Sequence, residues 1–276
     1  MLILSEINIY PIKSLGGISL QSSIVEERGL KYDRRWMLVD ETNKFITQRI
    51  YPQMALLQVL LKDNGLLVEH KKAKSEILFI PFNYESAETK DVVIWNDLVA
   101  GSFYNSSIDD WFSDTLKVKC RLVYMRDSTE RIVGPKKIQN KIVSFADGYP
   151  FLIIGQSSLD DLNSRLKEPL PMNRFRPNFV FTGGEPYEED MWNKFKIGEV
   201  KFLAVKPSIR CVITTTNQET SERAHEPLLT LSKYRKSGSG VIFGMNLVCE
   251  STGEVKSGDK IEPLKTNLFN SLKRIL

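Results

Sequence analysis

The stretch LLQVLLKDNGLLVEH, residues 56–70, is the part of the sequence that most directly indicates the fold class. Two apolar runs, residues 56–62 and 66–70, flank an Asp-Asn-Gly tripeptide. Asn-Gly is a strong signal for a tight hairpin turn, because both residues tolerate the positive φ angles that such a turn requires. The stretch therefore predicts two antiparallel strands joined by a short turn.

Further short strands are expected around this hairpin in the first hundred residues. Residues 36–40 and 45–49 flank a polar turn and predict a second hairpin. Apolar and polar residues alternate in residues 2–10 and, more loosely, in residues 19–26, and both segments are expected to be strands. Two shorter strands are expected at residues 76–81 and 91–95. Closely spaced hairpins without intervening helices are typical of a small β-barrel or β-sandwich.

The pattern changes after residue 104. Behind possible N-caps at residues 105–107, apolar residues recur at helical spacing, at Ile108, Trp111, Phe112 and Leu116. We therefore expect a helix over residues 105–116 and a strand at residues 119–125. Residues 126–144 are polar and contain a Gly-Pro-Lys-Lys run, which predicts a mobile loop at or just after a domain boundary.

Strands also dominate the expected structure of the second half of the sequence. They are residues 151–154, 178–182, 200–205, 211–216, 241–249 and 260–262. One helix carries Leu159, Leu162 and Leu166 on a single face, with Ser158 and Asp161 resembling a capping box at its start, and a second spans residues 227–233. These elements predict a mostly-β (α+β) fold of two mostly-β domains with a few helices.

Composition excludes several classes of protein. No stretch of the 276 residues approaches the ~18 uninterrupted apolar residues of a membrane helix. Glu6 interrupts the first apolar run too early for a signal peptide. We therefore expect a soluble, cytoplasmic chain with no membrane partner. The formal charge of +4 permits an anionic ligand but falls short of the dense basic face of a nucleic-acid-binding protein.

The cysteines argue against the common cysteine-rich sites. Cys120, Cys211 and Cys249 are odd in number and far apart, no CxxC occurs, and the only histidines are His70 and His225. A disulfide framework, a zinc finger and a cysteine-ligated iron–sulfur cluster are therefore not expected. The sequence also lacks the GxSxG elbow of a serine hydrolase.

Residues 172–178 carry the most unusual pattern of charge. Pro177 disfavours a helical conformation at Arg176, so we expect an extended segment. Arg174 and Arg176 would then project to the same side, as a clamp for phosphate or another planar anion, and Phe175 would face the core. An edge strand with two solvated arginines explains the same residues equally well.

Three other segments each resemble part of an anion site. Residues 155–158 lie between a buried strand and a helix, where free backbone N–H groups can hold a phosphate. Residues 10–17 form a strand that runs into two glycines and presents Lys13, without P-loop spacing. Residues 33–36 carry Arg34 and Arg35, one of which would point inward and need an anionic partner. An ordinary N-cap, a plain hairpin turn and a surface pair are the simpler alternatives.

Cys211 differs from the other two cysteines in its neighbours. Arg210 precedes it and favours a thiolate, which would suit a thiophilic metal or persulfide chemistry. Taken alone, a cysteine at the start of a β-branched run is more often a core residue. Cys120 and Cys249 lie in apolar strands without a cationic neighbour, and we expect both to be packing residues.

Together these segments resemble the MOSC family, named after the C-terminal domain of molybdenum cofactor sulfurase. YPIKS (10–14) and DRRW (33–36) resemble motifs of its N-terminal β-barrel. The segments that resemble the MOSC domain itself are FADGYPFLIIGQSSLDDLNSRL (145–166), NRFRPNFVF (173–181) and RCVITTT (210–216). The most similar subgroup contains the mitochondrial amidoxime-reducing component and its bacterial N-hydroxylaminopurine-reducing relatives.

The resemblance implies an N-terminal β-barrel domain over residues 1–117 and a MOSC β-barrel domain over residues 118–276. It also implies a bound molybdenum cofactor, Mo-molybdopterin, with Cys211 as the ligand of the metal. The residues that it places around this cofactor are Lys13, Ser14 and Arg34 from the first domain and Ser157, Ser158, Asn173, Arg174, Arg176 and Arg210 from the second. Asp147 matches an acidic residue near the metal that would position water or relay protons.

Two positions depart from the family pattern. Ser208 stands where many relatives have a second cysteine, so a two-thiol mechanism at that position is not expected. Residues 217–221 replace a DPxTG-like turn. In addition, the cysteines cannot ligate the plant-type ferredoxin module that is fused to some relatives, so electrons would come from a separate redox protein.

The resemblance favours an oxidoreductase that reduces small N-hydroxylated compounds, such as amidoximes and N-hydroxylaminopurines. The alternative is a sulfur carrier or a protein that handles molybdenum cofactor, with Cys211 carrying a persulfide. A basic-surface binding module without catalytic activity is the third hypothesis, and it predicts steeply salt-dependent binding to a polyanion.

Overall fold

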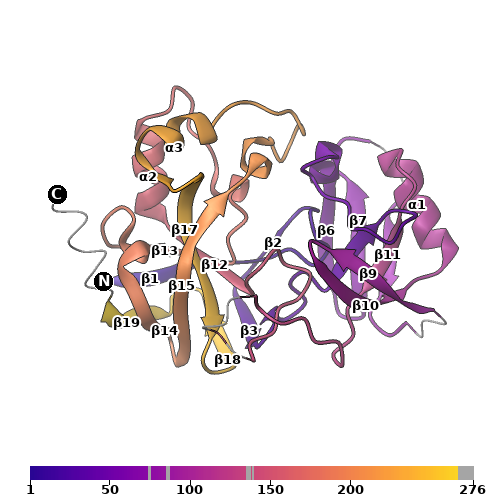
Figure 1. Cartoon of the computed structure of the whole chain (residues 1–276), viewed down its shortest axis with the longest axis horizontal. Helices are drawn as coiled ribbons and strands as arrows, with labels where there is room; N and C mark the ends of the chain where they lie inside the picture. The colour runs from indigo at the N-terminus through magenta and orange to yellow at the C-terminus, as the bar shows by residue number, and fades with distance from the viewer. Residues whose placement is uncertain (74–75, 85–87, 135–137, 139, 267–276) are drawn as a thin grey trace.

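Strands make up most of the regular secondary structure of the molecule, which Figure 1 shows as two lobes side by side. The computed structural model describes residues 1–73, 76–84, 88–134, 138 and 140–266. The α-helices within these residues are α1 (Ser106–Leu116), α2 (Gln156–Ser164) and α3 (Leu228–Tyr234). The expected mostly-β fold is confirmed. None of the helices described is both long and apolar enough to cross a membrane.

One lobe, here called the barrel lobe, is built on a single large sheet with the strand order β12-β13-β1-β19-β14-β15-β17-β16. Because β12 also pairs with β17, the strands from β12 to β17 in this order close into a ring, and β2 pairs with β1 outside it. The strands are β1 (Leu2–Ile9), β2 (Ile18–Leu20), β12 (Phe151–Gly155), β13 (Phe179–Thr182), β14 (Trp192–Ile197), β15 (Val200–Arg210), β16 (Lys236–Ser237), β17 (Gly240–Cys249) and β19 (Lys260–Thr266).

Aromatic side chains fill the interior of this barrel. Phe151, Phe179 and Phe202 are almost fully buried, and their ring centroids lie 5.5–5.8 Å apart. Phe202 also stacks on Phe195 at 5.6 Å. Burying each such side chain contributes on the order of 1.5–3 kcal/mol. Since the interior is packed, polar residues available for function lie outside it, and strand ends and loops supply many of them.

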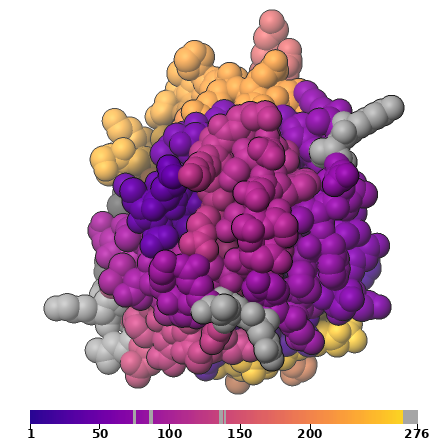
Figure 2. Space-filling model, turned by 90° about the vertical axis from the view of Figure 1, so that its right-hand side faces the viewer, coloured from indigo at the N-terminus to yellow at the C-terminus, as the bar shows by residue number. Residues whose placement is uncertain are grey.

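The other lobe, here called the N-terminal lobe, contains two smaller sheets and α1. The strands of the first are β5 (Trp36–Val39), β9 (Thr89–Ile94), β10 (Asp97–Phe103) and β11 (Arg121–Tyr124), and those of the second are β6 (Leu57–Lys62), β7 (Gly65–His70) and β8 (Leu78–Pro81). β6 and β7 confirm the hairpin at residues 56–70, with Lys62 opposite Gly65. Figure 2 faces this lobe and shows the magenta segment that includes α1 across its outer surface.

The expected helix at residues 105–116 is confirmed as α1. Asn105 caps it, because its Oδ1 accepts a hydrogen bond from the Ile108 N–H at 3.2 Å. Ile108, Phe112 and Leu116 are buried and join the core of the N-terminal lobe. The apolar stripe that predicted the helix therefore also fixes the face that it turns inward.

The remaining short elements include a third sheet, whose buried residues Val25, Leu30 and Val255 join the core of the barrel lobe. This sheet has the order β18-β3-β4. Its strands are β3 (Ser22–Glu26), β4 (Gly29–Leu30) and β18 (Gly253–Lys256). The 3₁₀ turns are η1 (Pro52–Leu56), η2 (Met172–Arg174), η3 (Glu188–Met191) and η4 (Val212–Thr215).

The second expected hairpin, at residues 36–40 and 45–49, is only half present. Its first arm is β5, but the second arm forms a single bridge, between Val39 and Phe45. The chain turns there instead, because the Ile50 and Tyr51 N–H groups both donate to the Thr47 carbonyl. This turn carries Arg49 away from the sheet. Strands β4, β10, β14, β16 and β18 were not predicted.

The strand pairing crosses the expected division of the chain at residues 117 and 118. β1 comes from the start of the chain but pairs with β13 and β19 in the barrel lobe. β11 follows residue 118 but pairs with β5 and β10 in the N-terminal lobe. The division itself stays a prediction.

Residues 126–144 connect the two lobes. The described part contains no helix and no named strand, and one bridge joins Ile132 to Ile142. Of the Gly-Pro-Lys-Lys run, only Gly134 belongs to the described residues. Residues 135–137 lie outside them. The loop ends three residues before Asp147, and Asp147 belongs to the site described next.

Candidate functional site

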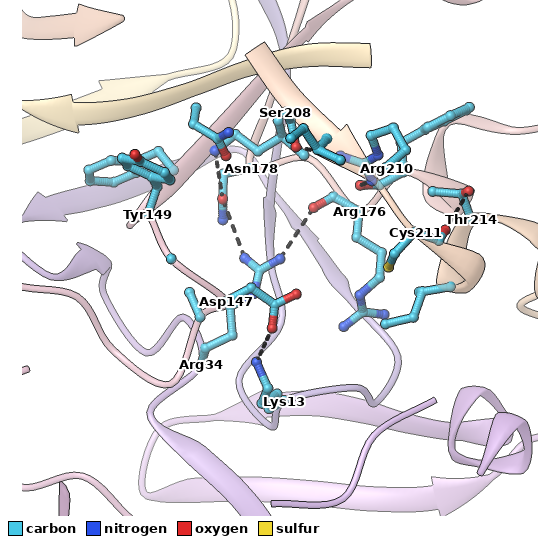
Figure 3. A pocket seen from close by; sticks show the side chains of 18 of the residues that line it. Lys13, Arg34, Asp147, Tyr149, Arg176, Asn178, Ser208, Arg210, Cys211 and Thr214 are labelled. Carbon is cyan, nitrogen blue, oxygen red and sulfur yellow. Dashed lines mark hydrogen bonds and ion pairs between the residues drawn. The ribbon is translucent and has the colours of Figure 1, made fainter. Parts of the chain in front are cut away.

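A cleft of about 380 Å³ lies between the two lobes and is lined by residues from distant parts of the sequence (Figure 3). Its polar and charged lining residues are Lys13, Ser14, Arg34, Arg49, Asp147, Tyr149, Arg176, Asn178, Lys206, Ser208, Arg210, Cys211, Thr214 and Asn246. The expected site residues among them are Lys13, Ser14, Arg34, Asp147, Arg176, Arg210 and Cys211. The structure thus brings together four of the segments singled out in the sequence.

The charge of the cleft is strongly positive. Its cationic lining residues are Lys13, Arg34, Arg49, Arg176, Lys206 and Arg210. Among the lining residues that the structure describes, Asp147 is the one carboxylate. Such an excess of positive charge on facing walls attracts an anionic ligand.

Asp147 joins two of these cations. Its Oδ1 accepts a hydrogen bond from Lys13 Nζ at 2.5 Å, and its Oδ2 accepts one from Arg49 Nη2 at 2.7 Å. Burial alone raises the pKa of Asp147, but Lys13 and Arg49 lower it by more, so the net pKa lies well below its usual range. Asp147 is therefore a carboxylate at neutral pH, and its side chain is still 51% exposed toward the cleft.

A buried arginine holds the backbone beside Asp147. Arg131 donates from Nη1 to the Ser144 and Ala146 carbonyls and from Nη2 to the carbonyl of Asp147 itself. Its Nε bonds Asp97 of β10 at 2.7 Å. The segment that carries Asp147 is thereby tied to the N-terminal lobe.

Lys13 is buried, and it follows β1 on the way to two glycines. Its ammonium donates to the Phe145 carbonyl at 2.8 Å as well as to Asp147. Burial lowers the pKa of Lys13 to about 8, with Asp147 opposing the shift. Lys13 can therefore exchange a proton near neutral pH more readily than an exposed lysine.

The backbone around the cleft is unusually often left-handed. Ser14, Arg34, Trp95 and Arg176 line the cleft and have φ angles of 50–70°. A non-glycine residue in this region costs on the order of 1–3 kcal/mol, and such residues cluster at functional sites. The surrounding contacts therefore select these conformations, which aim the side chains of Arg34 and Arg176.

Tyr10 packs against two arginines. The guanidinium carbons of Arg34 and Arg176 lie 4.4 and 4.1 Å from the centre of its ring, and its hydroxyl donates to the Pro177 carbonyl at 3.2 Å. Arg34 has an anionic partner, because its Nη1 lies 2.6 Å from Asp33. These contacts hold both guanidinium groups at the cleft.

Arg34 and Arg35 were expected to include one inward-pointing residue with an anionic partner, and this is confirmed. Arg35 is 5% exposed and bonds Asp127 at 2.6 Å and the Met125 carbonyl. Arg34 contacts the cleft instead, where Nη1 donates to Asn178 Oδ1 at 3.3 Å. The two neighbours therefore have different roles.

Arg176 and Lys206 are the cleft cations without a hydrogen bond or ion pair to any described residue, and Arg176 is the less exposed of the two. The Arg176 guanidinium forms no hydrogen bond or ion pair with any residue that the structure describes, apart from its contact with the Tyr10 ring. Burial lowers the pKa of Arg176 to about 10, which still leaves it charged at neutral pH. A charged group without a protein partner, facing a cleft, is suited to an external anion.

Cys211 lies where β15 ends. We expected a strand at residues 211–216, and this is wrong, because the segment turns into η4. Thr214 Oγ1 and Thr215 Oγ1 each donate to a carbonyl three residues earlier, at 2.9 and 2.8 Å, which favours a tight helical turn over an extended strand. Cys211 is half-buried, and its sulfur faces the cleft in Figure 3.

The other two cysteines are buried, as expected. Cys120 and Cys249 are 2% and 1% exposed. Burial raises the pKa of the Cys120 thiol to about 11 and also raises that of Cys249. Both are neutral thiols in the core, so Cys211 is the cysteine available to a ligand in the cleft.

Two arginines keep donor atoms free beside Cys211. Arg210 donates from Nη1 to Ser208 Oγ at 3.0 Å and from Nη2 to the Phe175 carbonyl at 2.6 Å, but its Nε is buried without a partner among the described residues. Arg49 Nη1 is also buried without an N or O partner among the described residues, and the Arg49 guanidinium interacts with Cys211 itself. Buried donors without partners are costly, so these atoms fit a bound group with acceptor oxygens.

Ser157 and Ser158 do not line the cleft. Ser158 is fully buried, and its Oγ donates to the Glu189 carboxyl oxygens at 3.0 Å. Ser157 Oγ donates to the Gly184 carbonyl at 2.9 Å. The expected capping box is wrong, because Gly155 is the N-cap of α2 and has no side chain to form one.

Asn173 and Arg174 also lie outside the cleft. The expected extended segment is wrong, because residues 172–174 form η2 and Arg176 is left-handed. Arg174 is buried, and its Nη1 has no partner among the described residues. Asn173 is exposed and lines a smaller cavity of about 190 Å³ that also touches Arg176. Arg174 and Arg176 therefore do not form the two-pronged clamp that we expected.

Several lining residues were missed in the sequence. Arg49 fell in an expected strand, and Trp95 was treated as the end of one. Tyr149 lies inside the segment at 145–166, and Lys206 lies five residues before Cys211, so only their closeness to these motifs could have pointed to them. No spacing pattern marks Arg49 or Trp95, which reach the cleft through turns of the N-terminal lobe.

The arrangement can bind an anion and offer one cysteine sulfur as a ligand. Among the residues that the structure describes, no three His, Cys, Asp or Glu side chains gather closely enough to hold a metal ion. A phosphate-bearing cofactor that chelates its own metal fits the residues present, because it would satisfy the free arginine donors and need only Cys211 from the chain.

Comparisons with known proteins match almost the whole chain. A family model described as the MOSC N-terminal beta barrel domain matches residues 1–119, and one described as the MOSC domain matches residues 140–262. Mitochondrial amidoxime reducing component 2 of Rattus norvegicus is 33% identical over 93% of this chain and 82% of its own length. Mitochondrial amidoxime-reducing component 1 of Mus musculus is 32% identical over 92% of this chain and 79% of its own length.

A plant relative is much longer. Molybdenum cofactor sulfurase of Solanum lycopersicum is 32% identical over 94% of this chain but only 35% of its own length. The chain thus spans about a third of that relative.

Proposed function

This chain belongs to the MOSC family, and on that premise we propose that it is a molybdenum-cofactor-dependent reductase of N-hydroxylated compounds such as amidoximes and N-hydroxylaminopurines. The observation that carries the proposal is the position of Cys211, the one unburied cysteine, at the edge of the cation-rich cleft. Relatives named amidoxime-reducing components, which the chain matches over most of their length, support the choice of reaction.

The residues of the cleft would hold the cofactor by charge and by one covalent ligand. Arg176 and Arg210 have donors that no described residue satisfies, so they would bind its phosphate and other acceptor oxygens. The thiolate of Cys211 would be the protein ligand of the metal. When bound, the cofactor supplies the two-electron chemistry by which R–NHOH, two electrons and two protons become R–NH₂ and water.

Lys13 and Asp147 would handle the protons that this reaction consumes. They share a hydrogen bond of 2.5 Å, and Asp147 is held as a carboxylate. Lys13 Nζ, with its pKa lowered to about 8, would donate a proton toward the cleft through Asp147 or an ordered water. Arg49 fixes the second oxygen of Asp147 and so orients it. A separate redox protein would supply the electrons.

The test replaces Cys211 with alanine. Protein from a molybdenum-replete host is assayed for benzamidoxime reduction with a chemical electron donor, and its molybdenum content per chain is measured. We expect Cys211→Ala to lose at least a hundredfold in turnover while its circular dichroism spectrum is unchanged. Cys120→Ala, the same substitution at a buried cysteine, is the matched control and should keep its activity.

Full activity in Cys211→Ala would refute the assignment. Wild-type protein that contains no molybdenum and no pterin would instead favour a binding module, which predicts steeply salt-dependent association with a polyanion.

The second candidate is a sulfur carrier or a cofactor-handling protein that uses a persulfide on Cys211. The accessibility of Cys211 and the similarity to a protein named molybdenum cofactor sulfurase favour it. It predicts cyanide-releasable sulfur on the wild-type chain and none on Cys211→Ala, together with cofactor exchange but no N–O turnover. Benzamidoxime reduction by the wild type decides for the reductase.

A further inference from the structure

Trp95 is an exposed aromatic residue at the mouth of the cleft. It lies in the turn between β9 and β10 and lines the same cleft as Cys211. It is 41% exposed, whereas Trp36 and Trp192 are 1% exposed. A large apolar surface left open beside a polar cleft is typical of a binding site.

The ring of Trp95 is held in place from the side of its own lobe. The Phe45 ring lies 5.0 Å away at a tilt of 58°, and the Arg49 guanidinium carbon lies 4.5 Å from the ring centre. The backbone of Trp95 is left-handed, with a φ of 56°, which is rare for so large a residue. These contacts fix the indole, and the surface they leave open borders the cleft.

An aliphatic side chain borders the cleft from the barrel lobe. Ile209 is 62% exposed and lies on β15, two residues before Cys211. Ile213, on the other side of Cys211, also lines the cleft. The cleft therefore has apolar side chains at Trp95, Ile209 and Ile213, and cationic side chains line other parts of its wall.

We propose that Trp95 contacts the substrate, stacking its indole on a planar aromatic or heteroaromatic group while the N–OH group lies at Cys211. An indole offers a flat apolar surface, and stacking on it favours planar rings over small aliphatic groups. This inference rests on the proposed function and adds a substrate class: aromatic N-hydroxylated compounds are preferred to small aliphatic ones.

The test compares an aromatic substrate with one that has no ring. Benzamidoxime and hydroxylamine are assayed with wild-type holoprotein, Trp95→Ala and Trp95→Phe. We expect Trp95→Ala to raise KM for benzamidoxime about tenfold with little change in kcat, the size typical of one lost stacking contact. Hydroxylamine reduction should stay within about twofold, and Trp95→Phe, which keeps an aromatic ring, should restore most of the loss.

The control variant is Leu98→Ala. Leu98 is 67% exposed in β10 of the same hairpin and is not among the lining residues of the cleft, so both substrates should be unaffected. An equal loss for both substrates in Trp95→Ala would overturn the proposal, because it would mean that Trp95 only supports Arg49 and the cofactor. An unchanged KM for benzamidoxime would overturn it as well.

A binding measurement separates this inference from the proposed function. Benzamidoxime is titrated into the holoprotein by calorimetry without an electron donor. We expect the Kd to rise about tenfold in Trp95→Ala and to change less than about twofold in Trp95→Phe. If benzamidoxime binding depends on Trp95 but the wild type does not turn benzamidoxime over, the proposed reductase function is refuted and the aromatic subsite is supported. Equal binding by wild type and Trp95→Ala would refute the subsite.

Discussion

Glu189 is a fully buried carboxyl whose replacement should change how stability depends on pH. Its oxygens accept hydrogen bonds from Ser158 Oγ at 3.0 Å, and Oε1 also accepts one from the Gly155 N–H at 3.3 Å. Burial, with a smaller contribution from Asp190, raises the pKa of Glu189 from 4.5 to about 7. The folded protein therefore holds a proton that the unfolded chain releases at lower pH.

The size and sign of the effect follow from this difference. Below pH 4.5 the carboxyl is protonated in both states, and between pH 4.5 and about 7 only the unfolded chain loses the proton. The free energy of unfolding therefore falls as the pH rises through this interval and levels off above it. At 1.36 kcal/mol for each pH unit, the loss amounts to about 3 kcal/mol.

Glu189→Gln removes this titration but keeps an amide that can bond Ser158 and Gly155. Urea unfolding followed by circular dichroism at about pH 4.5 and about pH 8 gives the free energy of unfolding of each protein. Between these pH values the variant should lose about 3 kcal/mol less than the wild type. Glu185→Gln, at an exposed position in the same segment, controls for the loss of one carboxyl. The same pH dependence in Glu189→Gln and wild type would refute the reasoning.

Three further substitutions test the cleft, the barrel and α1. Arg176→Gln removes a half-buried cleft cation without a described hydrogen-bonding partner and should lower the molybdenum retained per chain at least tenfold, measured by metal analysis; unchanged content would exclude Arg176 from cofactor binding. Phe202→Ala should lower the free energy of unfolding by about 3–5 kcal/mol in urea titrations, because it empties the centre of the barrel. Asn105→Ala should cost about 1 kcal/mol in the same measurement, since it removes the side-chain cap of α1.

Local signals in the sequence were sufficient for much of the fold. The Asp-Asn-Gly signal and the apolar stripe of residues 105–116 correctly predicted a hairpin and a helix, because neighbouring residues determine both. The turn itself consists of Asp63 and Asn64, since Gly65 already pairs with Lys62, and neither Asn64 nor Gly65 has a positive φ. Pairing over long distances left no such signal. Nothing near Leu2 indicates that it lies opposite Ile261. The strand expected at residues 211–216 was wrong because threonine hydroxyls bond the backbone three residues earlier, which β-branched composition does not show.

The candidate site was predictable where a charged residue lies in a recognisable motif, as with Lys13, Arg34 and Arg176. The direction of these side chains was not predictable, because two of the three residues are left-handed and only tertiary contacts select that conformation. Ser158 shows the converse. It lies in a motif but faces Glu189, a buried acceptor 31 residues later in the chain.

The pairing of β1 in the barrel has a consequence for biosynthesis. β1 is synthesised before the other described strands, yet its pairing with β19 joins Leu2 to Ile261. At synthesis rates of ~5–20 residues per second, the first strand waits roughly 13–52 s for this partner. The barrel therefore closes only after translation of β19. A nascent chain that stalls earlier leaves the barrel open at the edge of β1 that pairs with β19, and an open strand edge is a target for chaperones and for aggregation.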